Sequence, residues 1–217
     1  MHITTFSEVT IDGKLSLGSG RSSKELFSFY GPDLARWFHA QRAAHDAIMV
    51  GAGTVRADDP ELTVRHVAGR NPLRVVPLGR EALDPHSTIL TDGLPTLLAL
   101  PAEHAGVYQG ASVETIICGV AQVDLGALVQ WLADLGISTL MVEGGSRLLH
   151  SFFAQDLVDR IVIKHIPILS GDPSAPNYLD GTVMALSAWD VESWERIGGI
   201  GVATYSRRAR QRHEVTA

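Results

Sequence analysis

The stretch 138–149 constrains the fold of this chain more than any other part of its sequence. A β-branched and apolar run, Ser138 to Val142, indicates a buried parallel strand. It leads through Glu143, Gly144 and Gly145 into a predicted helix that Ser146 can cap and whose apolar residues face inward: Leu148, Leu149, Phe152 and Phe153. Because glycine lets backbone N–H groups approach an anion and a helix N-terminus carries partial positive charge, the stretch predicts a phosphate loop. Glu143 would then lie at the carboxyl end of a strand, where open α/β sheets bind ligands.

Strands and helices alternate along most of the chain. Further strands are predicted at 2–10, 46–50, 73–78, 96–100, 115–118 and 160–167, with two more around Val191 and at 202–205. The strands alternate with helices in the amino-terminal and middle parts, whereas the carboxyl end contains mainly strands. This order predicts an α/β fold, a three-layer α/β/α sandwich on a mostly parallel central sheet with an antiparallel carboxyl-terminal edge.

Two further helices have clear sequence signals. One follows Gly31-Pro32-Asp33, and it can bury Leu34, Trp37, Phe38 and Ala44 on one side, with Arg42 near its end. The other begins after the capping residue Asp124 and ends at Gly136, with leucines at helical spacing between them.

Composition narrows the class of protein. The 217 residues are 45% hydrophobic and 19% charged, which predicts a single soluble domain with a proper core. A net charge of −6 argues against a general nucleic-acid binder, although a local basic pocket would not show in that sum. The single cysteine, Cys118, excludes an internal disulfide and a Cys-rich zinc site. With no signal peptide near Met1 and no apolar run of membrane-spanning length, we expect a cytoplasmic protein.

One domain is expected over residues 1–206, followed by a basic tail at 207–217. The tail contains four arginines, Arg207, Arg208, Arg210 and Arg212. A solvated, flexible tail is favoured over an RNA-binding arm.

Two glycine-containing segments in the amino-terminal half are candidates for ligand contact. Residues 51–55 predict a second strand-to-loop transition, although a lone Gly-x-Gly is a weak signal of anion binding. Residues 15–23 are rich in glycine and serine, so they could wrap a ligand or simply form a solvated connector.

A fixed acidic loop follows the second glycine segment. Pro60 keeps Asp59 out of helical geometry, so a loop is expected from Asp58 to Arg65. The paired aspartates could form a metal site or an acid/base pair, but a simple turn is favoured because no further ligands stand at suitable spacing.

Several pieces of the sequence fall into the order of a known family. They are Ile11-Asp12-Gly13-Lys14, Gly20-Arg21-Ser22, Arg42-Ala43 running into Asp46-Ala47-Ile48, Val142-Glu143-Gly144-Gly145, and the specific block Thr54-Val-Arg-Ala-Asp-Asp-Pro-Glu-Leu-Thr-Val-Arg65. Over nearly its whole length the chain resembles the reductase domain of riboflavin biosynthesis, whose fold is similar to that of dihydrofolate reductase. Bifunctional members of that family also have a zinc-dependent deaminase domain, whose signature requires more cysteines than this chain contains.

The resemblance implies an activity and a cofactor. We expect an NADPH-dependent reductase, with NADH possible, that converts a ribosylamino-pyrimidinone 5′-phosphate to its ribitylamino product. It also implies a homodimer, no metal, and no nucleic-acid or membrane partner. Two alternatives remain open: a dihydrofolate-reductase-like enzyme acting on another pterin or pyrimidine, and a non-catalytic nucleotide-binding homologue.

By the same resemblance, the substrate site takes its residues from four parts of the chain. Ser22, Arg42, the Leu62 backbone and Arg65 would surround the substrate phosphate, since guanidinium groups offer several fixed donors. Lys14 and Glu143 are the catalytic candidates; Glu143 can accept hydrogen bonds from the pyrimidine, and Lys14 can donate to a hydroxyl or assist ring opening. Alternatively, Arg42 could simply pair with a neighbouring carboxylate.

The positions that match the family's cofactor residues lie on both sides of the glycine segments. They are Lys24, Thr54, Asp58, Gly79, Gly144, Gly145, Ser146, Arg147 and Leu148, within a run that continues to Ser151. The two glycines at the helix N-terminus would hold the diphosphate. Taken one at a time, the glycines could equally be tight turns.

Three positions depart from the family pattern, and all are on the cofactor side. Glu8 replaces a small residue expected beside the nicotinamide, Lys24 replaces an apolar or aromatic residue, and 76–79 replaces a strand that usually ends near an aspartate. These departures leave open the choice between NADPH and NADH, and whether the chain reduces a different, related substrate or has lost activity. The choice between the amino and the deaminated pyrimidine is open too, because backbone groups or pocket shape would read that substituent.

Overall fold

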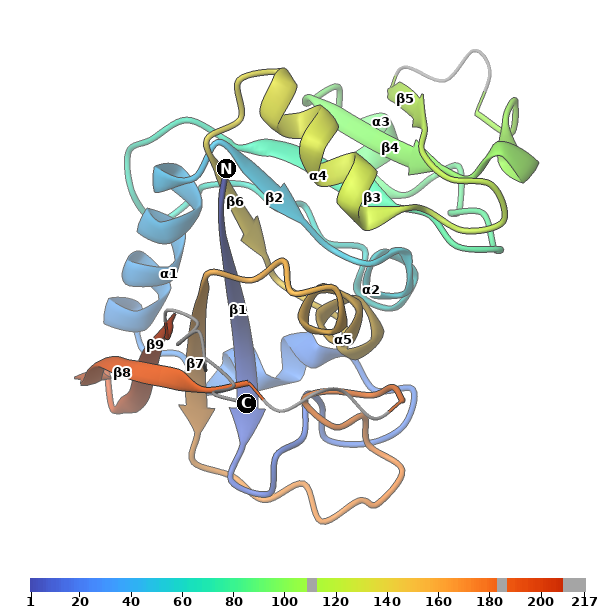
Figure 1. The fold of residues 1–217 in the computed structure, drawn as a ribbon. Coiled ribbons are helices and arrows are strands. Elements are labelled where there is room, and N and C mark those ends of the chain that lie inside the picture. Colours follow the sequence, from blue (N-terminus) through green and yellow to red (C-terminus); the bar gives the residue numbers. More distant parts are fainter. Residues whose placement is uncertain (109–112, 183–186, 209–217) are drawn as a thin grey trace, which may run out of the picture.

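One mixed sheet organises the protein (Figure 1). The computed structural model describes residues 1–108, 113–182 and 187–208, and over these ranges the sheet has nine strands in the order β5-β4-β3-β2-β6-β1-β7-β9-β8. The strands are β1 His2–Thr10, β2 Ala47–Met49, β3 Leu73–Pro77, β4 Thr96–Leu100, β5 Glu114–Ile117, β6 Thr139–Val142, β7 Arg160–Ile166, β8 Trp189–Ile197 and β9 Ile200–Arg207. Strands β1 to β7 pair in parallel, and β9 pairs antiparallel with both β7 and β8.

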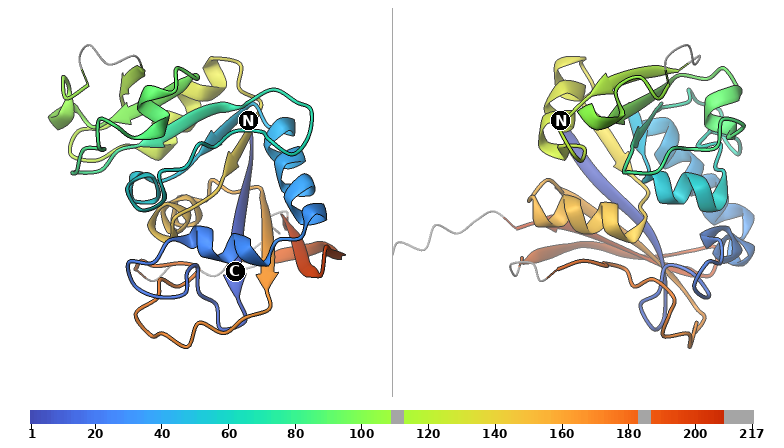
Figure 2. Two further views of the ribbon diagram at one scale, coloured as in Figure 1. Left: turned by 180° about the vertical axis from the view of Figure 1, so that it is seen from behind. Right: turned by 90° about the vertical axis from the view of Figure 1, so that its right-hand side faces the viewer.

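Helices cover both faces of the sheet (Figure 2). On one face lie η1 Ser23–Phe29, α1 Pro32–Ala44, α2 Ala52–Asp58 and α3 Thr88–Thr91; on the other lie α4 Leu125–Asp134 and α5 Ser146–Ala154, and η2 Ala102–His104 lies in the loop after β4. Alternate residues of each central strand enter opposite cores, as Met49 and Ile48 of β2 do. The predicted three-layer α/β/α sandwich with a mostly parallel sheet and an antiparallel edge is therefore confirmed.

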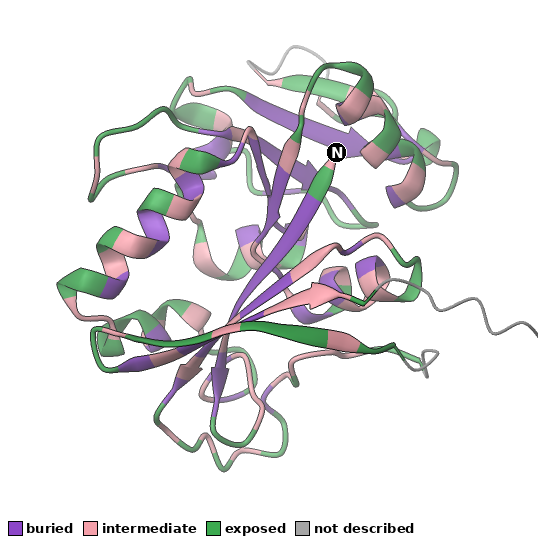
Figure 3. Ribbon diagram, turned by 60° about the vertical axis from the view of Figure 1, so that its left-hand side comes forward, coloured by how far each residue is buried: buried purple, intermediate pink, exposed green. Residues whose placement is uncertain are grey.

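Residues in the centre of the sheet are buried, whereas those of the edge strand β8 are mostly exposed to solvent (Figure 3). Strand β4 is buried along its whole length, which explains its continuous apolar sequence. Strand β8 is mostly exposed, including Val191 and Trp194. No helix in the described ranges combines the length and apolar content needed to cross a membrane.

Two local predictions were wrong. Residues 51–55 do not form a loop, because helix α2 begins at Ala52 directly after Gly51. Ser146 is not the cap of α5: Gly145 occupies the capping position, and the buried Ser146 hydroxyl donates to the carbonyl of Asn177 at 2.7 Å. In both cases the packing of the helix N-terminus against a neighbouring segment, rather than local propensity, sets the first helical residue.

The predicted ends of α4 are confirmed, and the predicted buried side of α1 is confirmed in part. The Asp124 side chain caps α4 by accepting the N–H of Ala127, and Gly136 follows the helix with a positive φ. In α1, Leu34 and Phe38 are buried as expected, whereas Ala44 is exposed and Arg42 takes its place on the buried side. Of the predicted tail, Arg207 is the last residue of β9 and Arg208 pairs with Asp190, while 209–217 lie outside the described residues.

Candidate active site

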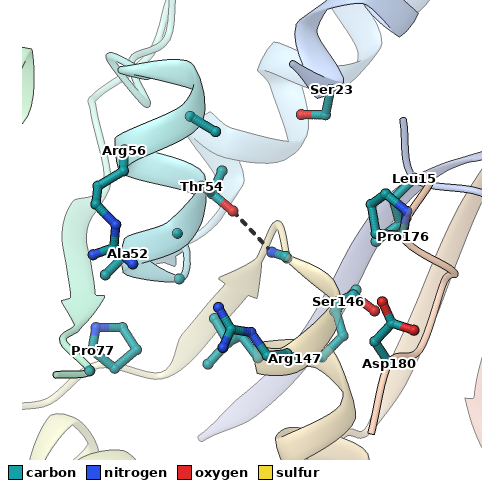
Figure 4. Close-up of a pocket in the computed structure, with 18 of the residues that line it drawn as sticks. Leu15, Ser23, Ala52, Thr54, Arg56, Pro77, Ser146, Arg147, Pro176 and Asp180 are labelled. Carbon is teal, nitrogen blue, oxygen red and sulfur yellow. Dashed lines mark hydrogen bonds between the residues drawn. The ribbon is translucent and has the colours of Figure 1, made fainter. Parts of the chain in front are cut away.

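A cleft of about 1220 Å³ opens at the carboxyl ends of β1, β2, β3 and β6. Its walls come from the segments that follow these strands, including the N-termini of α2 and α5 (Figure 4). Nine predicted residues line it: Thr54, Asp58, Gly79, Glu143, Gly144, Gly145, Ser146, Arg147 and Leu148. The carboxyl edge of a parallel sheet, where its loops diverge, is where ligands of open α/β folds bind.

The N-termini of α2 and α5 are joined at the floor of the cleft. Thr54 Oγ1 accepts the N–H of Gly145 at 3.2 Å, and Gly51 N–H donates to the Gly144 carbonyl at 2.9 Å (Figure 4). Gly144 has φ of 102°, and a Cβ on Gly145 would lie 3.1 Å from the Thr54 hydroxyl oxygen. Backbone conformation therefore favours glycine at 144, and at 145 a Cβ would crowd the Thr54 hydroxyl that accepts the Gly145 N–H.

The side chains around this junction fit an anionic nucleotide. Arg56, Arg80 and Arg147 line the cleft, as does Glu81, which is paired with Arg56. Asp58 lines it too; one carboxylate oxygen accepts the Ser23 hydroxyl at 2.7 Å, whereas Oδ1 is buried and has no hydrogen-bond partner among the described residues. Guanidinium groups suit phosphates, and the orphaned acceptor suits a ribose hydroxyl. The cleft thus offers what a dinucleotide cofactor needs.

Glu143, the residue before Gly144, also lines the cleft and is paired with Arg42. Both carboxylate oxygens accept from the guanidinium, from Nε and Nη2 at 2.6 Å each, and the side chains are only 10% and 6% exposed. Arg42 Nη1 also donates to the Thr63 carbonyl at 3.1 Å. The alternative in which Arg42 pairs with a neighbouring carboxylate therefore describes this structure, and the pair holds Glu143 in one orientation.

The acidic loop is fixed as the sequence predicts, by contacts that the sequence does not reveal. Asp59 and Leu62 have positive φ values of 37° and 56°. The buried Arg74 donates to the Glu61 carbonyl at 3.1 Å, and the His39 ring accepts the N–H of Arg65 at 3.1 Å. Two buried arginines and a histidine thus hold a strained backbone in place.

His39 makes the stability of this loop depend on pH. Burial first, and then the charges of Arg42 and Arg65, lower the pKa of His39 from 6.5 to about 4. Between these two values the unfolded chain binds a proton that the folded chain does not, so the free energy of unfolding rises with pH across this window. In His39→Gln, which retains an acceptor for Arg65, we expect a smaller rise. Urea unfolding at several pH values from about 4 to about 6.5 measures it, and equal slopes in the two proteins would contradict the assignment.

Six predicted residues lie outside the cleft lining: Lys14, Ser22, Lys24, Arg42, Leu62 and Arg65. Lys14 Nζ donates to Asn177 Oδ1 at 2.8 Å and contacts the Ala175 carbonyl, so it anchors the 175–177 segment. Ser22 caps η1 by accepting the N–H of Lys24, whose own ammonium contacts the Asp59 carbonyl. Arg65 projects at the surface, 47% exposed, beside Glu61. The structure therefore groups most predicted cofactor residues with Glu143 in one cleft, and leaves the predicted substrate-phosphate residues outside its lining.

Sequence reasoning missed a second buried ion pair beside the cleft. Lys164 of β7 is opposite Glu8 of β1 and is bound to its carboxylate, which also accepts the Tyr30 hydroxyl. The signal was present: Lys164 alternates with Val162 and Ile166, so it belongs to the buried side of β7. A charge on an otherwise apolar face indicates a buried partner.

The chain is similar to proteins of a known family in sequence and in structure. The sequence profile described as the RibD C-terminal domain matches residues 1–201. A protein of Aquifex aeolicus named 2,5-diamino-6-ribosylamino-4(3H)-pyrimidinone 5′-phosphate reductase is 37% identical over 185 residues, covering 83% of each chain. A protein of the same name from Archaeoglobus fulgidus is 38% identical over 203 residues, covering 87% of this chain and 90% of its own. The solved structure of Acinetobacter baumannii RibD superposes with a TM-score of 0.78 at 21% identity, over 95% of this chain and 58% of that one. Because the profile matches residues 1–201 and the two reductases are 37% and 38% identical over 83% and 87% of this chain, the chain belongs to the RibD C-terminal domain family.

Proposed function

We propose that the protein reduces 2,5-diamino-6-ribosylamino-4(3H)-pyrimidinone 5′-phosphate to its ribitylamino product with NADPH. The observation that carries the proposal is one cleft whose lining combines three arginines, Arg56, Arg80 and Arg147, with the carboxylate of Glu143; Arg56 is paired with Glu81, which lines the cleft too. The diamino substrate is favoured over the deaminated one because the relatives from Aquifex aeolicus and Archaeoglobus fulgidus carry that substrate in their names.

The reaction requires orientation more than strong acid or base catalysis. Opening the sugar ring breaks the bond between C1′ and the ring oxygen, the oxygen takes a proton, and the exocyclic nitrogen loses one to form a C1′=N bond. A bound reduced nicotinamide supplies a hydride to C1′, and the nitrogen takes a proton from solvent. The protein must therefore hold two phosphorylated molecules so that the reacting atoms meet.

In this proposal, different residues of the cleft bind the cofactor diphosphate, its 2′-phosphate and the pyrimidine of the substrate. Gly144, Gly145 and Arg147 at the N-terminus of α5 would bind the cofactor diphosphate. Arg56 and Arg80 would favour NADPH over NADH, because a 2′-phosphate needs cationic partners. Glu143, held by Arg42, would accept hydrogen bonds from the amino and N–H groups of the pyrimidine.

The substrate phosphate would bind outside this cleft lining, at the rim. Ser22, Arg65 and the backbone at Leu62 would hold it there, with Arg42 acting through Glu143 and the Thr63 carbonyl. Lys14 would contact the ribose only after its ammonium leaves Asn177 Oδ1. A cytoplasmic homodimer completes the proposal, and the exposed edge strand β8 is the surface that supports self-association.

The direct test is the absorbance of the reduced nicotinamide with purified protein and the diamino ribosylamino substrate. We expect oxidation of NADPH, faster than that of NADH, and slower turnover of the deaminated pyrimidine. Failure to oxidise either cofactor with either substrate would overturn the reductase proposal. Sedimentation of the same sample tests the dimer.

Replacing Arg65 with Ala should raise the KM for the substrate about tenfold, with little change in kcat or in the KM for NADPH. A charge-assisted hydrogen bond to a phosphate contributes about 1.5–3 kcal/mol. Arg70→Ala is the matched control, since Arg70 is also an exposed arginine but pairs with Asp46 away from the cleft. An unchanged KM in Arg65→Ala would remove Arg65 from the phosphate site.

A further inference from the structure

Two buried ion pairs stand side by side behind one end of the cleft, and they share an orientation. They are Glu8–Lys164 and Glu143–Arg42. Both acids line the cleft, whereas neither cation is among its lining residues. The four groups sum to zero charge, but they present a negative face to the cleft.

An aromatic ring fixes the two cations behind the acids. Lys164 Nζ lies 3.3 Å from the centre of the Phe38 ring, and the Arg42 guanidinium carbon lies 5.0 Å from it. The Lys164 side chain is 0% exposed, while that of Glu8 is 13% exposed. Because Phe38 and Arg42 both belong to α1, one helix holds the cationic side of both pairs in place.

Stability does not explain such an arrangement. Apolar residues of similar size often replace a buried ion pair at no cost, because desolvation offsets the attraction between the charges. In each pair the acid is the more exposed side chain, 13% against 0% for Glu8 and Lys164 and 10% against 6% for Glu143 and Arg42, and only the acids line the cleft. The arrangement therefore indicates that the two carboxylates interact with a positively charged group of a ligand bound in the cleft.

Groups of the described residues bind only one carboxylate oxygen of Glu8, but both oxygens of Glu143. Glu8 Oε1 accepts the Tyr30 hydroxyl and is the oxygen bound by Lys164, whereas no hydrogen bond joins Oε2 to any described residue. Both oxygens of Glu143, in contrast, are bound by Arg42. Glu8 thus has one carboxylate oxygen available to a ligand.

The charge on Glu8 persists at neutral pH. Burial alone would raise the pKa of its carboxyl, but the ammonium of Lys164 and the hydrogen bonds from Lys164 and Tyr30 outweigh burial and lower that pKa below its usual value. The Glu143 and Arg42 charges lie close enough to act on the same cluster. Glu8 therefore presents a negative charge to the cleft at neutral pH.

Charge also decides which part of a dinucleotide can lie at this end. The anionic diphosphate is repelled by Glu8 and Glu143 and attracted by Arg56, Arg80, Arg147 and the N-terminus of α5. The nicotinamide ring carries no charge when reduced and a positive charge when oxidised. The acidic end therefore suits the ring, and suits its oxidised form best.

We propose that Glu8, held by Lys164 and Tyr30, is an electrostatic catalytic residue that stabilises the positive charge developing on the nicotinamide as hydride leaves. This inference rests on the proposed nicotinamide-dependent function. An interaction that strengthens as the reaction proceeds lowers the barrier, whereas one of equal strength throughout does not. It also gives a purpose to a glutamate where the family resemblance leads us to expect a small residue.

The test compares the binding of oxidised and reduced cofactor, which differ only in the ring. Titration calorimetry or fluorescence gives the Kd of NADP⁺ and of NADPH for wild type and for Glu8→Gln. We expect the variant to lose about tenfold in affinity for NADP⁺ relative to NADPH, the size of effect that one nearby opposite charge has on a titrating group. The hydride-transfer rate in a single turnover should fall by a similar factor.

A second variant guards against misfolding, because Glu8→Gln leaves the Lys164 ammonium buried beside a neutral amide. The double variant Glu8→Gln/Lys164→Met removes both charges at similar volume, and it should show the same shift in the ratio of the two Kd values. Glu192→Gln is the matched control: it makes the same substitution on an exposed residue of β8, paired with Arg160 far from the cleft lining, and should leave the ratio unchanged.

The outcomes separate this proposal from the function on which it rests. If wild type neither binds nor oxidises NADPH, the proposed function fails. If wild type oxidises NADPH but the folded double variant retains the wild-type ratio and single-turnover rate, Glu8 only supports the fold and the inference is overturned. An equal loss of affinity for NADP⁺ and NADPH also overturns the inference, because it would mean that Glu8 affects the shape of the site and not the charge of the nicotinamide.

Discussion

Glu143→Gln is expected to reduce kcat/KM for the pyrimidine substrate by about 100-fold or more, the cost of removing a preorganised polar contact from a reacting site. The carboxylate lines the cleft and is held in one orientation by two hydrogen bonds of 2.6 Å from Arg42. A glutamine cannot accept from two pyrimidine donors and satisfy Arg42 at the same time. Steady-state oxidation of NADPH at varied substrate concentration measures the effect.

Glu143→Asp separates the chemistry from the stability of the ion pair. Aspartate keeps the charge that Arg42 requires, so the free energy of unfolding should recover toward wild type while activity recovers only in part, because the carboxylate is displaced. Near-ultraviolet circular dichroism confirms that both variants are folded. Wild-type kcat/KM in folded Glu143→Gln would remove Glu143 from the substrate site.

Arg74→Ala should lower the free energy of unfolding by about 3–5 kcal/mol, the cost of breaking a buried pair by removing one partner. The Arg74 side chain is 1% exposed and binds Asp92 with two hydrogen bonds, at 2.6 and 2.7 Å. It also donates to Thr96 and to the carbonyls of Glu61 and Leu94. Urea unfolding monitored by fluorescence measures the loss.

Arg36→Ala provides the control for Arg74→Ala, because Arg36 also pairs with an aspartate but is 56% exposed. Exposed pairs contribute about 0–1 kcal/mol, so this variant should be nearly as stable as wild type. The substrate KM should also rise in Arg74→Ala, since Arg74 holds the loop that presents Arg65. A loss below about 1 kcal/mol in Arg74→Ala would show that the loop is held by other contacts.

Local signals predicted the fold because the central elements agree with their own sequence. Strand β4 is buried on both faces, and α4 has a capping aspartate, leucines at helical spacing and a terminal glycine. At the N-termini of α2 and α5 the same approach failed. There, the positions of Gly51 and Gly145 depend on hydrogen bonds between two segments far apart in the chain.

The sequence likewise identified some residues of the candidate site but not the contacts between them. The resemblance identified Thr54, Asp58, Gly144 and Gly145, which the structure brings into one cleft. It could not show that Arg42 is bound to Glu143, nor that Lys14 is held by Asn177. A guanidinium that suits a phosphate also suits a carboxylate, and only the three-dimensional neighbours decide between them.

The stretch from Ser138 to Leu149 contains both features that its own sequence determines and features that depend on distant parts of the chain. Its sequence by itself determined a buried strand, an acid at the strand's end, glycines and a helix, because apolar periodicity and glycine content act over a few residues. Only the tertiary structure decided which N–H groups stay available, since Thr54 takes that of Gly145, and which partner Glu143 keeps. The Glu8–Lys164 pair depends on the pairing of β1 with β7, whose partners are more than a hundred residues apart in the chain. Electrostatic energy depends on distance in space, so no local pattern could have shown that both acids face one cleft.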